Sequence, residues 1–244
     1  MKKLLILFLA VSANLSFAQE AILLRLNYEK GATYGVSMNV SQEMGTVMSM
    51  GMVMDMEIKV TDVKDDTYNC EMKFTKMTMD MLQGGQVMSF DSTKSDEELD
   101  ETGKMMKAQM GPMLKTLISA KGNNLGEILE VTVAPNVPGV GDMAKQSSNV
   151  VYPKEALNVG STWTMTKEEK GMKMDFLYTV KSITGDKVIL DLSGDVTGMA
   201  TGKISGNMDV DRASGIPENS LINMDLSVSG QELKSKITMT MAKK

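Results

Sequence analysis

The sequence predicts an all-β, mainly antiparallel protein with one short helix, built on a curved sheet or half-barrel, or on a sandwich. Three observations lead to this fold class. Apolar and polar residues alternate over residues 48–60, turn-forming Gly, Asn and Asp recur between short apolar segments, and the apolar phase shifts once after Phe74. Only a strand places every second side chain on one face, so these patterns favour β-structure along most of the chain.

The segment 48–60 has the clearest alternation in the chain. Its odd positions include the polar residues Ser49, Asp55 and Glu57. A strand with one face on a core and one face toward solvent shows this pattern. Its even positions are all apolar: Met48, Met50, Met52, Met54, Met56, Ile58 and Val60.

A turn at 64–67 leads into a returning strand that begins with residues 68–74. Beyond it the apolar positions change from even to odd, which predicts a β-bulge or bend near Thr75 and Lys76. The sequence Gln-Gly-Gly-Gln at 83–86 then predicts a tight hairpin. The apolar positions after the shift are Met77, Met79 and Met81.

One helix is expected near residues 96–110. Ser95 and Glu98 have the spacing of a capping box, and acidic residues suit the positive end of a helix dipole. Gly111 and Pro112 are expected to end the helix. The same acidic run has the composition of a calcium site, but a solvated helix start is the simpler interpretation.

The chain divides into two β halves. Residues 19–133 form a methionine-rich half, residues 134–159 with Pro135 and Pro138 form a linker, and residues 160–244 form a second half. Short motifs repeat between the halves, as in Gly-Ala-Thr-Tyr at 31–34 and Gly-Ser-Thr-Trp at 160–163. A tandem duplication is therefore one interpretation, with both halves expected to pack as one unit.

The first 18 residues are typical of a secretory signal peptide. Lys2 and Lys3 precede a short apolar run, and Ser16 and Ala18 supply the small residues that precede a cleavage site. We expect cleavage near Ala18 and a periplasmic or secreted product. No later segment is apolar enough to span a bilayer as a helix, which needs about 20 residues.

Composition argues against several functions. The net charge of −5 is the opposite of the basic footprint that nucleic-acid binding needs. There is no histidine, so the usual general base and the commonest metal ligand are missing, and no nucleophile-elbow or phosphate-loop motif occurs. We therefore expect no enzymatic activity and no cofactor. Asp209 and Asp211 are expected on the polar face of a strand, and Cys70, the single cysteine, as a small buried hydrophobe.

The chain resembles a family of uncharacterised exported proteins of Gram-negative bacteria, a domain of unknown function. The resemblance implies a β-rich fold and no established activity. A looser, topological likeness is to half-barrels of the lipoprotein-carrier type, which hold acyl chains. The family resemblance rests on Leu26 with Lys30-Gly31-x-Thr33-Tyr34, Gly84-Gly85-Gln86-x-Met88, Pro153-Lys154, Val159-Gly160-Ser161-Thr162-Trp163, and Ser205-Gly206-x-Met208-x-Val210-Asp211-x-x-Ser214-Gly215.

The 26 methionines are the chemical peculiarity of the sequence, and most of them lie between Met38 and Met113. Four interpretations are open. The methionines fill the core with flexible side chains, they line a deformable apolar pocket, they bind Cu(I) as soft ligands, or they consume oxidants by being reversibly oxidised. A pocket would have the helix across its mouth and would bind a lipid or another apolar small molecule. The candidate ligand-binding residues are Met48, Met50, Met52, Met54, Met56, Met77, Met79 and Met81.

The function expected from these observations is an exported, non-enzymatic envelope protein that binds an apolar ligand or a protein partner. The alternative is methionine-mediated binding of Cu(I). Residues 46–60 are the candidate for a long edge strand that would recruit an envelope protein partner by β-augmentation.

Overall fold

A computed structural model describes residues 21–145, 150–169 and 171–244, so the predicted signal peptide lies outside the described residues. All strands belong to one antiparallel sheet of 12 strands, as the sequence predicted for the fold class. The order is β6-β5-β3-β2-β1-β12-β11-β10-β9-β8-β7, and β4 pairs with β3. The strands are β1 (Thr33–Met44), β2 (Met48–Lys64), β3 (Thr67–Gln83), β4 (Gln86–Asp91), β5 (Leu117–Asn123), β6 (Ile128–Ala134), β7 (Thr162–Glu169), β8 (Met172–Ile183), β9 (Lys187–Gly198), β10 (Ala200–Asp211), β11 (Pro217–Val228) and β12 (Gln231–Lys243).

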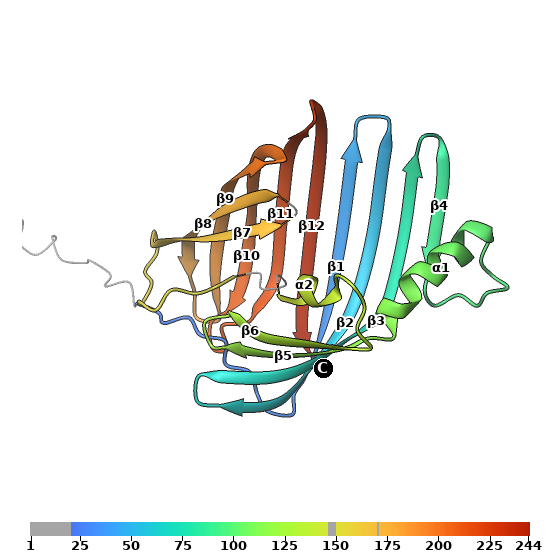
Figure 1. The fold of residues 1–244 in the computed structure, drawn as a ribbon. Coiled ribbons are helices and arrows are strands. Elements are labelled where there is room, and N and C mark those ends of the chain that lie inside the picture. Colours follow the sequence, from blue (N-terminus) through green and yellow to red (C-terminus); the bar gives the residue numbers. More distant parts are fainter. Residues whose placement is uncertain (1–20, 146–149, 170) are drawn as a thin grey trace, which may run out of the picture.

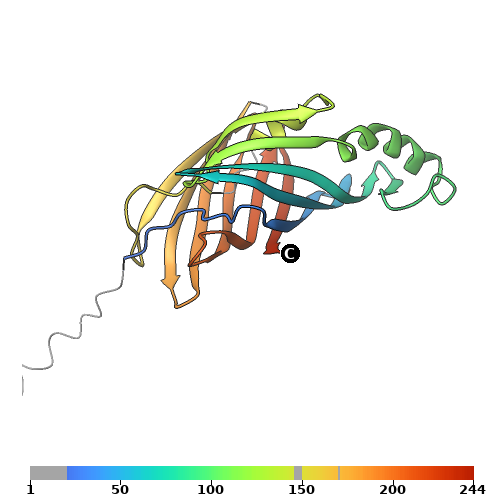
Figure 2. The ribbon, with the colours of Figure 1, turned by 90° about the horizontal axis from the view of Figure 1, so that it is seen from below.

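The sheet is open and strongly curved. Its central strands stand side by side in Figure 1, while β5 and β6 at one end and β7 and β8 at the other turn toward the viewer. Seen from below in Figure 2, the curved ribbon brings the strands of both ends of the sheet toward the same side. Glycine at two positions allows the close approach of neighbouring strands that fits this curvature. A Cβ atom on Gly194 would collide with the carbonyl oxygen of Asp175, and a Cβ atom on Gly206 would collide with the carbonyl oxygen of Leu221.

The first and last strands meet at the centre of the sheet. β1 pairs with β12 from Tyr34 opposite Lys243 to Glu43 opposite Lys234, and its other side pairs with β2. The two sequence halves thus share one continuous sheet. The segment 134–159, expected to be a linker, contains the short helix α2 (Val140–Lys145).

The predicted strands and most turns of the sequence are confirmed. Glycines fill the β3–β4 hairpin, where Gly84 and Gly85 have φ of 58° and 82°, values that glycine adopts without steric cost. The turn between β5 and β6 follows Asn123 and ends before Ile128. There the Asn123 side chain accepts hydrogen bonds from the backbone N–H groups of Leu125 and Glu127, which stabilises this turn.

The predicted bulge is confirmed between β2 and β3. Asp55 lies opposite Lys76 and Met56 lies opposite Phe74, which leaves Thr75 as the extra residue. Phe74 and Met77 are therefore both buried on the same face although their positions differ by an odd number.

The helix prediction was wrong in its boundaries. The helix α1 spans Glu101–Leu114, and Asp100 caps it by accepting a hydrogen bond from the Gly103 N–H. Ser95 and Glu98 instead close a separate turn, in which the Glu98 carboxylate accepts hydrogen bonds from the Ser95 N–H and hydroxyl. Pro112 lies inside the last turn rather than ending the helix.

The expected edge strand was also wrong. Residues 48–60 belong to β2, which pairs with β1 on one side and β3 on the other, so its backbone is not free to add another strand. Within the described part of the chain the ends of the sheet are β6 and β7.

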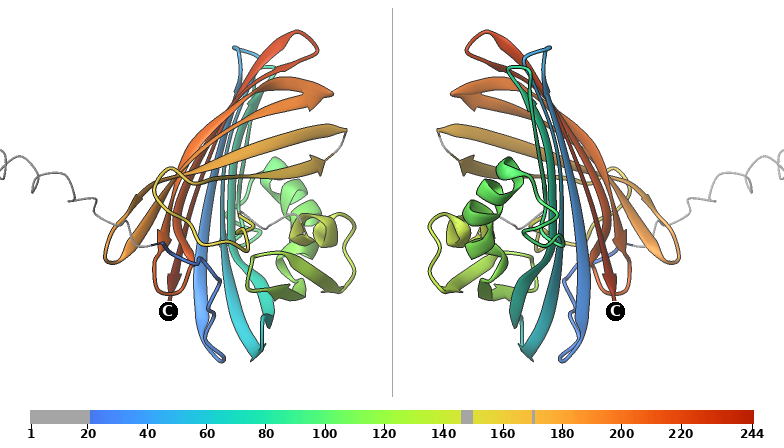
Figure 3. Two further views of the ribbon diagram at one scale, coloured as in Figure 1. Left: turned by 90° about the vertical axis from the view of Figure 1, so that its left-hand side faces the viewer. Right: turned by 90° about the vertical axis from the view of Figure 1, so that its right-hand side faces the viewer.

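The core consists of two main apolar clusters. One lies against β8, β9 and β10 and includes Leu24, Tyr178 and Met208, which are fully buried. The other lies against β2, β3 and β5 and includes Met77 and Met106. In Figure 3 both helices and the β5–β6 hairpin lie on the same side of the sheet, the concave one. None of the helices in the described residues is long and apolar enough to cross a membrane.

Candidate functional site

A cavity of about 450 Å³ lies on the concave face of the sheet. Nine strands contribute side chains to its lining, and the six that form most of the apolar wall are β1, β2, β3, β8, β11 and β12. Five of these strands, β3, β2, β1, β12 and β11, are consecutive neighbours in the sheet, whereas β8 belongs to its curled end. The cavity therefore lies on the side toward which the sheet bends. The apolar residues of the wall are Val36, Met38, Met54, Met56, Ile58, Met72, Phe74, Met174, Phe176, Ile222, Met224, Ile237, Met239 and Met241.

Segments outside the central strands cover this wall. Met143 and Ala144 of α2 line the cavity, as do Ile118 of β5 and Ile128 of β6. The N-terminal segment adds Leu26 to the lining. The Leu26 N–H donates a hydrogen bond to the Asn124 carbonyl, and the Asn27 N–H donates one to the Ser214 carbonyl. This segment therefore connects the β5–β6 turn to the β10–β11 turn beside the cavity.

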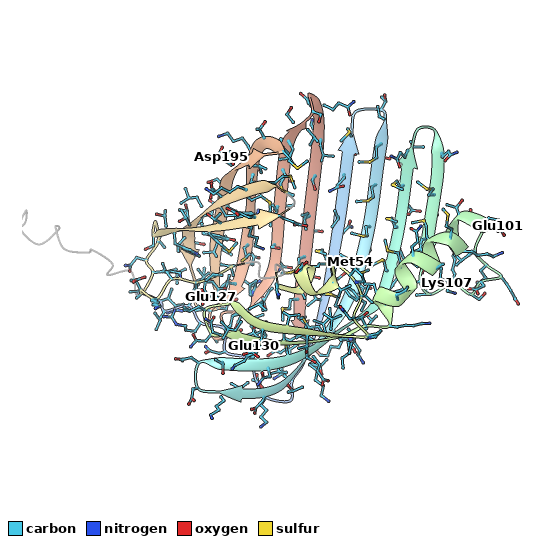
Figure 4. All side chains as sticks on the ribbon, in the orientation of Figure 1. Met54, Glu101, Lys107, Glu127, Glu130 and Asp195 are labelled. Atoms are coloured by element: carbon cyan, nitrogen blue, oxygen red, sulfur yellow. The ribbon has the colours of Figure 1, made fainter. Side chains whose placement is uncertain are left out.

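Methionines form a row across four neighbouring strands. Met54 lies opposite Met38 on one side and Met77 on the other, and Met38 in turn lies opposite Met239. Side chains paired in this way have Cβ atoms about 4.5–5.5 Å apart. Met54, labelled in the middle of the sheet in Figure 4, Met38 and Met239 line the cavity.

Much of the apolar wall is only partly buried. Met38, Met56, Met174 and Met224 retain intermediate exposure although they lie on the concave face. Unbranched thioether side chains adapt their shape to a contacting surface. The cavity thus presents deformable apolar side chains that the described residues cover only in part.

Two charged side chains interrupt this apolar lining. Lys167 and Glu169 occupy alternate positions of β7, so both project to the same side of the strand, and both line the cavity. Burial lowers the pKa of the Lys167 ammonium from its usual value to about 8, with Glu169 acting in the opposite direction.

The remaining ionisable groups of the cavity are held neutral. Burial raises the pKa of Cys70 to about 11 and raises the pKa of Tyr28 and Tyr68. The three side chains lie close together, with the rings of Tyr28 and Tyr68 in an edge contact at 4.7 Å between centroids. Cys70 is buried, in keeping with the small hydrophobe expected from the sequence.

The eight methionines proposed from the sequence share one face but not one cavity. Met54 and Met56 line it. Met77 and Met79 are buried in the cluster beneath α1, and Met52 packs partly buried against that cluster. Met50 and Met81 line a separate shallow depression near the far ends of β2 and β3, and Met48 begins β2 there. The structure therefore groups the eight into three places.

The helix expected across the mouth lies elsewhere. α1 packs on β4 and β3, with Met106 buried against them, and its position beside β4 is visible in Figure 1. The short helix α2 borders the cavity instead, through Met143 and Ala144.

Sequence patterns missed most of the cavity. Met224 and Met239 come from the last two strands, Met174 from β8, and Lys167 from β7. Each of these strands was expected, but no local signal shows that β12 pairs with β1. The alternation of β7 was the sequence feature that could have placed Lys167 on the inner face, because it puts Lys167 on the same side as Trp163. The ring of Trp163 stacks on Tyr178 in the core.

Hard-metal binding has no support in the described parts of the chain. Across residues 21–145, 150–169 and 171–244, no group of three or more Cys, Asp or Glu side chains is placed to hold a metal ion. Asp211 accepts hydrogen bonds from the Ser214 N–H and hydroxyl, which lowers the pKa of its carboxyl group. Asp209 lies 3.9 Å from the Lys187 ammonium. Both carboxylates thus serve local contacts.

Comparison with known proteins gives a family of unknown function and a likeness in fold. The family described as "Family of unknown function (DUF6263)" matches residues 142–240. No curated protein matches the chain. The structure described as "Lipid-protein interactions in lipovitellin" is similar over 88% of this chain, with a TM-score of 0.57 and 13% sequence identity. This chain covers 25% of the lipovitellin chain, so the likeness concerns about a quarter of that chain.

Proposed function

We propose that this protein is a non-enzymatic binding protein that holds an apolar molecule, such as the acyl chain of a lipid, in the concave cavity. The observation that carries the proposal is a cavity of about 450 Å³ with an almost wholly apolar lining. This volume is within the range of about 300–1,000 Å³ in which small-molecule sites fall.

The partial exposure of the cavity methionines supports the same conclusion. Apolar surface that is transferred from water to an apolar contact contributes roughly 25 cal/mol per Å² of favourable free energy. Met38, Met56 and Met224 keep part of their apolar surface exposed and therefore do not gain all of this free energy. An aliphatic ligand would supply the contact. The lipovitellin likeness agrees with such a role, since that structure is described by its lipid–protein interactions.

The proposal includes a location outside the cytoplasm and the absence of catalysis. The location is supported by the signal-like N-terminal sequence. The absence of catalysis is supported by the chemistry of the lining, where Cys70, Tyr28 and Tyr68 have raised pKa values and therefore stay protonated near neutral pH.

Native mass spectrometry of the mature protein, isolated anaerobically from its own host, tests the proposal together with titration of a neutral apolar fluorophore such as Nile red. We expect a bound organic mass and saturable fluorophore binding. Met224→Trp should block binding by filling the cavity from β11, whereas Met199→Trp, at a residue that is 75% exposed, should bind like the wild type. Equal binding by both variants would contradict the proposed site.

A second candidate function is Cu(I) binding, which the row of Met54, Met38 and Met239 favours. Thioethers are soft ligands that select Cu(I), and these three side chains are cross-strand neighbours on the cavity wall. A copper adduct in the same mass spectrum would support it. Replacement of all three by leucine should then abolish Cu(I) uptake from a competing chelator while apolar binding persists.

A further inference from the structure

Two hairpin turns stand side by side at one end of the sheet and expose apolar side chains. The β1–β2 turn and the β3–β4 turn both lie at the upper end in Figure 1, and the Gly84 N–H donates a hydrogen bond of 3.2 Å to the Val47 carbonyl. Val47, Leu82 and Val87 are 55%, 38% and 72% exposed. We call these two turns with the three side chains the paired tips. Met199, at the β9–β10 turn, is separated from them by β11 and β12 and lies outside this surface.

The paired tips contain no charged residue. Residues 44–54 and 81–90 are all uncharged, whereas the turn at the opposite end of β2 and β3, residues 64–66, consists of one lysine and two aspartates. A surface without a cation that is backed by carboxylates suits an uncharged partner, because carboxylates repel an anionic lipid surface. The first charged residue that follows the tips on each of the four strands is acidic: Glu43, Asp55, Asp80 and Asp91.

The inner face of β2 connects the paired tips with the cavity. Met48 follows Val47 directly, Met50 lines the shallow depression at the tips, and Met54 lines the cavity. Met48, Met50, Met52 and Met54 occupy alternate positions and therefore share one face, which we call the methionine track. From Met48 to Met54 the track is roughly 20 Å long at the usual rise of a strand. An acyl chain at the tips would contact deformable apolar side chains all the way to the cavity.

The shape of the paired tips favours a fluid partner over a folded one. The turns are thin, because a Cβ atom added to Gly45, Gly84 or Gly85 would meet no other described atom within 4 Å. A stable protein interface buries about 800 Å² on each partner, whereas three side chains on two thin turns form a narrow edge. A lipid bilayer adapts to projecting apolar side chains and takes them up at the boundary of its head groups and acyl chains.

We propose that the paired tips dock on an uncharged lipid bilayer, at the end of the methionine track that leads to the cavity. This inference rests on the proposed function, because the bilayer is then the source or the destination of the apolar ligand. It adds to that function the surface at which the protein meets its ligand and the kind of partner that this surface fits.

Co-sedimentation of the mature protein with sucrose-loaded vesicles tests the docking. The protein should bind vesicles of phosphatidylcholine, which are uncharged overall, equally at low and high salt, because the contact contains no ion pair. Addition of phosphatidylglycerol, an anionic lipid, should not increase the bound fraction. Absence of binding to phosphatidylcholine, or binding that requires phosphatidylglycerol and disappears at high salt, would overturn the inference.

A double variant of the paired tips assigns the binding to them. Val47→Ser combined with Val87→Ser should lower the partition onto phosphatidylcholine vesicles about tenfold or more, because two exposed apolar side chains no longer leave water. The matched control combines Val63→Ser with Leu129→Ser, which removes two exposed apolar side chains elsewhere and should bind like the wild type. An unchanged partition in the tip variant, or an equal loss in the control, would overturn the inference.

A polarity-sensitive dye locates the contact without removing an apolar side chain from the second tip. The dye on Val87→Cys should brighten when phosphatidylcholine vesicles are added, and the dye on Val63→Cys, at the opposite end of the sheet, should not. Cys70 is buried and therefore does not compete for the label. Equal brightening at both positions would overturn the inference.

The remaining outcomes separate docking from the proposed function. A dimer in sedimentation velocity that the tip variant abolishes, together with no vesicle binding, would assign the tips to a second copy of the chain and overturn the inference. Vesicle binding that depends on the tips, with no Nile red binding and no bound organic mass, would support the docking and refute the proposed function. Nile red binding with vesicle binding unchanged in the tip variant would refute the docking alone.

Discussion

Met54 of β2 lies directly opposite Met38 of β1, and both thioethers border the cavity. Met54 is only 6% exposed, whereas its other neighbour Met77 is fully buried and does not reach the cavity. Three methionines in one row thus have different surroundings. Their replacement separates the methionines that hold the core from those that shape the cavity.

The first prediction concerns Met77→Ala and Met54→Ala. We expect Met77→Ala to lower the free energy of unfolding by about 2–5 kcal/mol, because it leaves a void in packed core. Met54→Ala should cost less, since part of its surface already faces open space, and should alter ligand size preference. Urea unfolding followed by circular dichroism measures both. Met105→Ala, at a residue that is 54% exposed, is the control and should change stability by less than about 0.5 kcal/mol.

The second prediction concerns oxidation. Under mild peroxide Met199 and Met105 should form sulfoxide first, Met38 and Met224 more slowly, and the fully buried Met208 last. Saturating dodecanoate should protect Met38 and Met224 alone, because only these two of the five border the cavity. Peptide mass spectrometry measures each site. Protection that is equal at Met199 would count against binding at the cavity.

The third prediction distinguishes the two possible caps of α1. Asp100→Ala should lower the free energy of unfolding by about 1 kcal/mol, because the Gly103 N–H loses its acceptor. Ser95→Ala should have a smaller effect, because Ser95 is exposed and closes only the preceding turn. Equilibrium unfolding in urea compares the two variants, and a larger loss in Ser95→Ala would contradict the observed cap.

The fold could be predicted from the sequence wherever the deciding pattern is local. Alternation in 48–60 fixed β2, and the phase change after Phe74 located the bulge at Thr75, because the two-residue period of a strand leaves no other way to keep both apolar sets on one face. The Ser95–Glu98 motif misled because two residues with this spacing also satisfy each other in a short turn without a helix.

The site could be predicted only in part, because sharing a face is not the same as sharing a cavity. β2 has 17 residues and is therefore roughly 57 Å long. Met48 and Met56 belong to one alternating set, yet they lie too far apart along the strand to contact one small ligand. Met224 and Met239 lie near the β2 methionines only because strands that are distant in sequence pair with one another. The alternation of apolar residues along a strand carries no information about such pairing.

The pairing of β1 with β12 has a consequence for biogenesis. Synthesis of the chain produces Tyr34 early and its partner Lys243 only much later, so the seam between them is the contact with the greatest sequence separation in the sheet. Each meander can begin to form alone, but closure of so long a loop is slow. Ile237, Met239 and Met241 of β12 also complete the cavity wall. A chain that lacks β12 would therefore have two unjoined sheets with exposed strand edges, and its cavity would lack the part of the wall that β12 supplies.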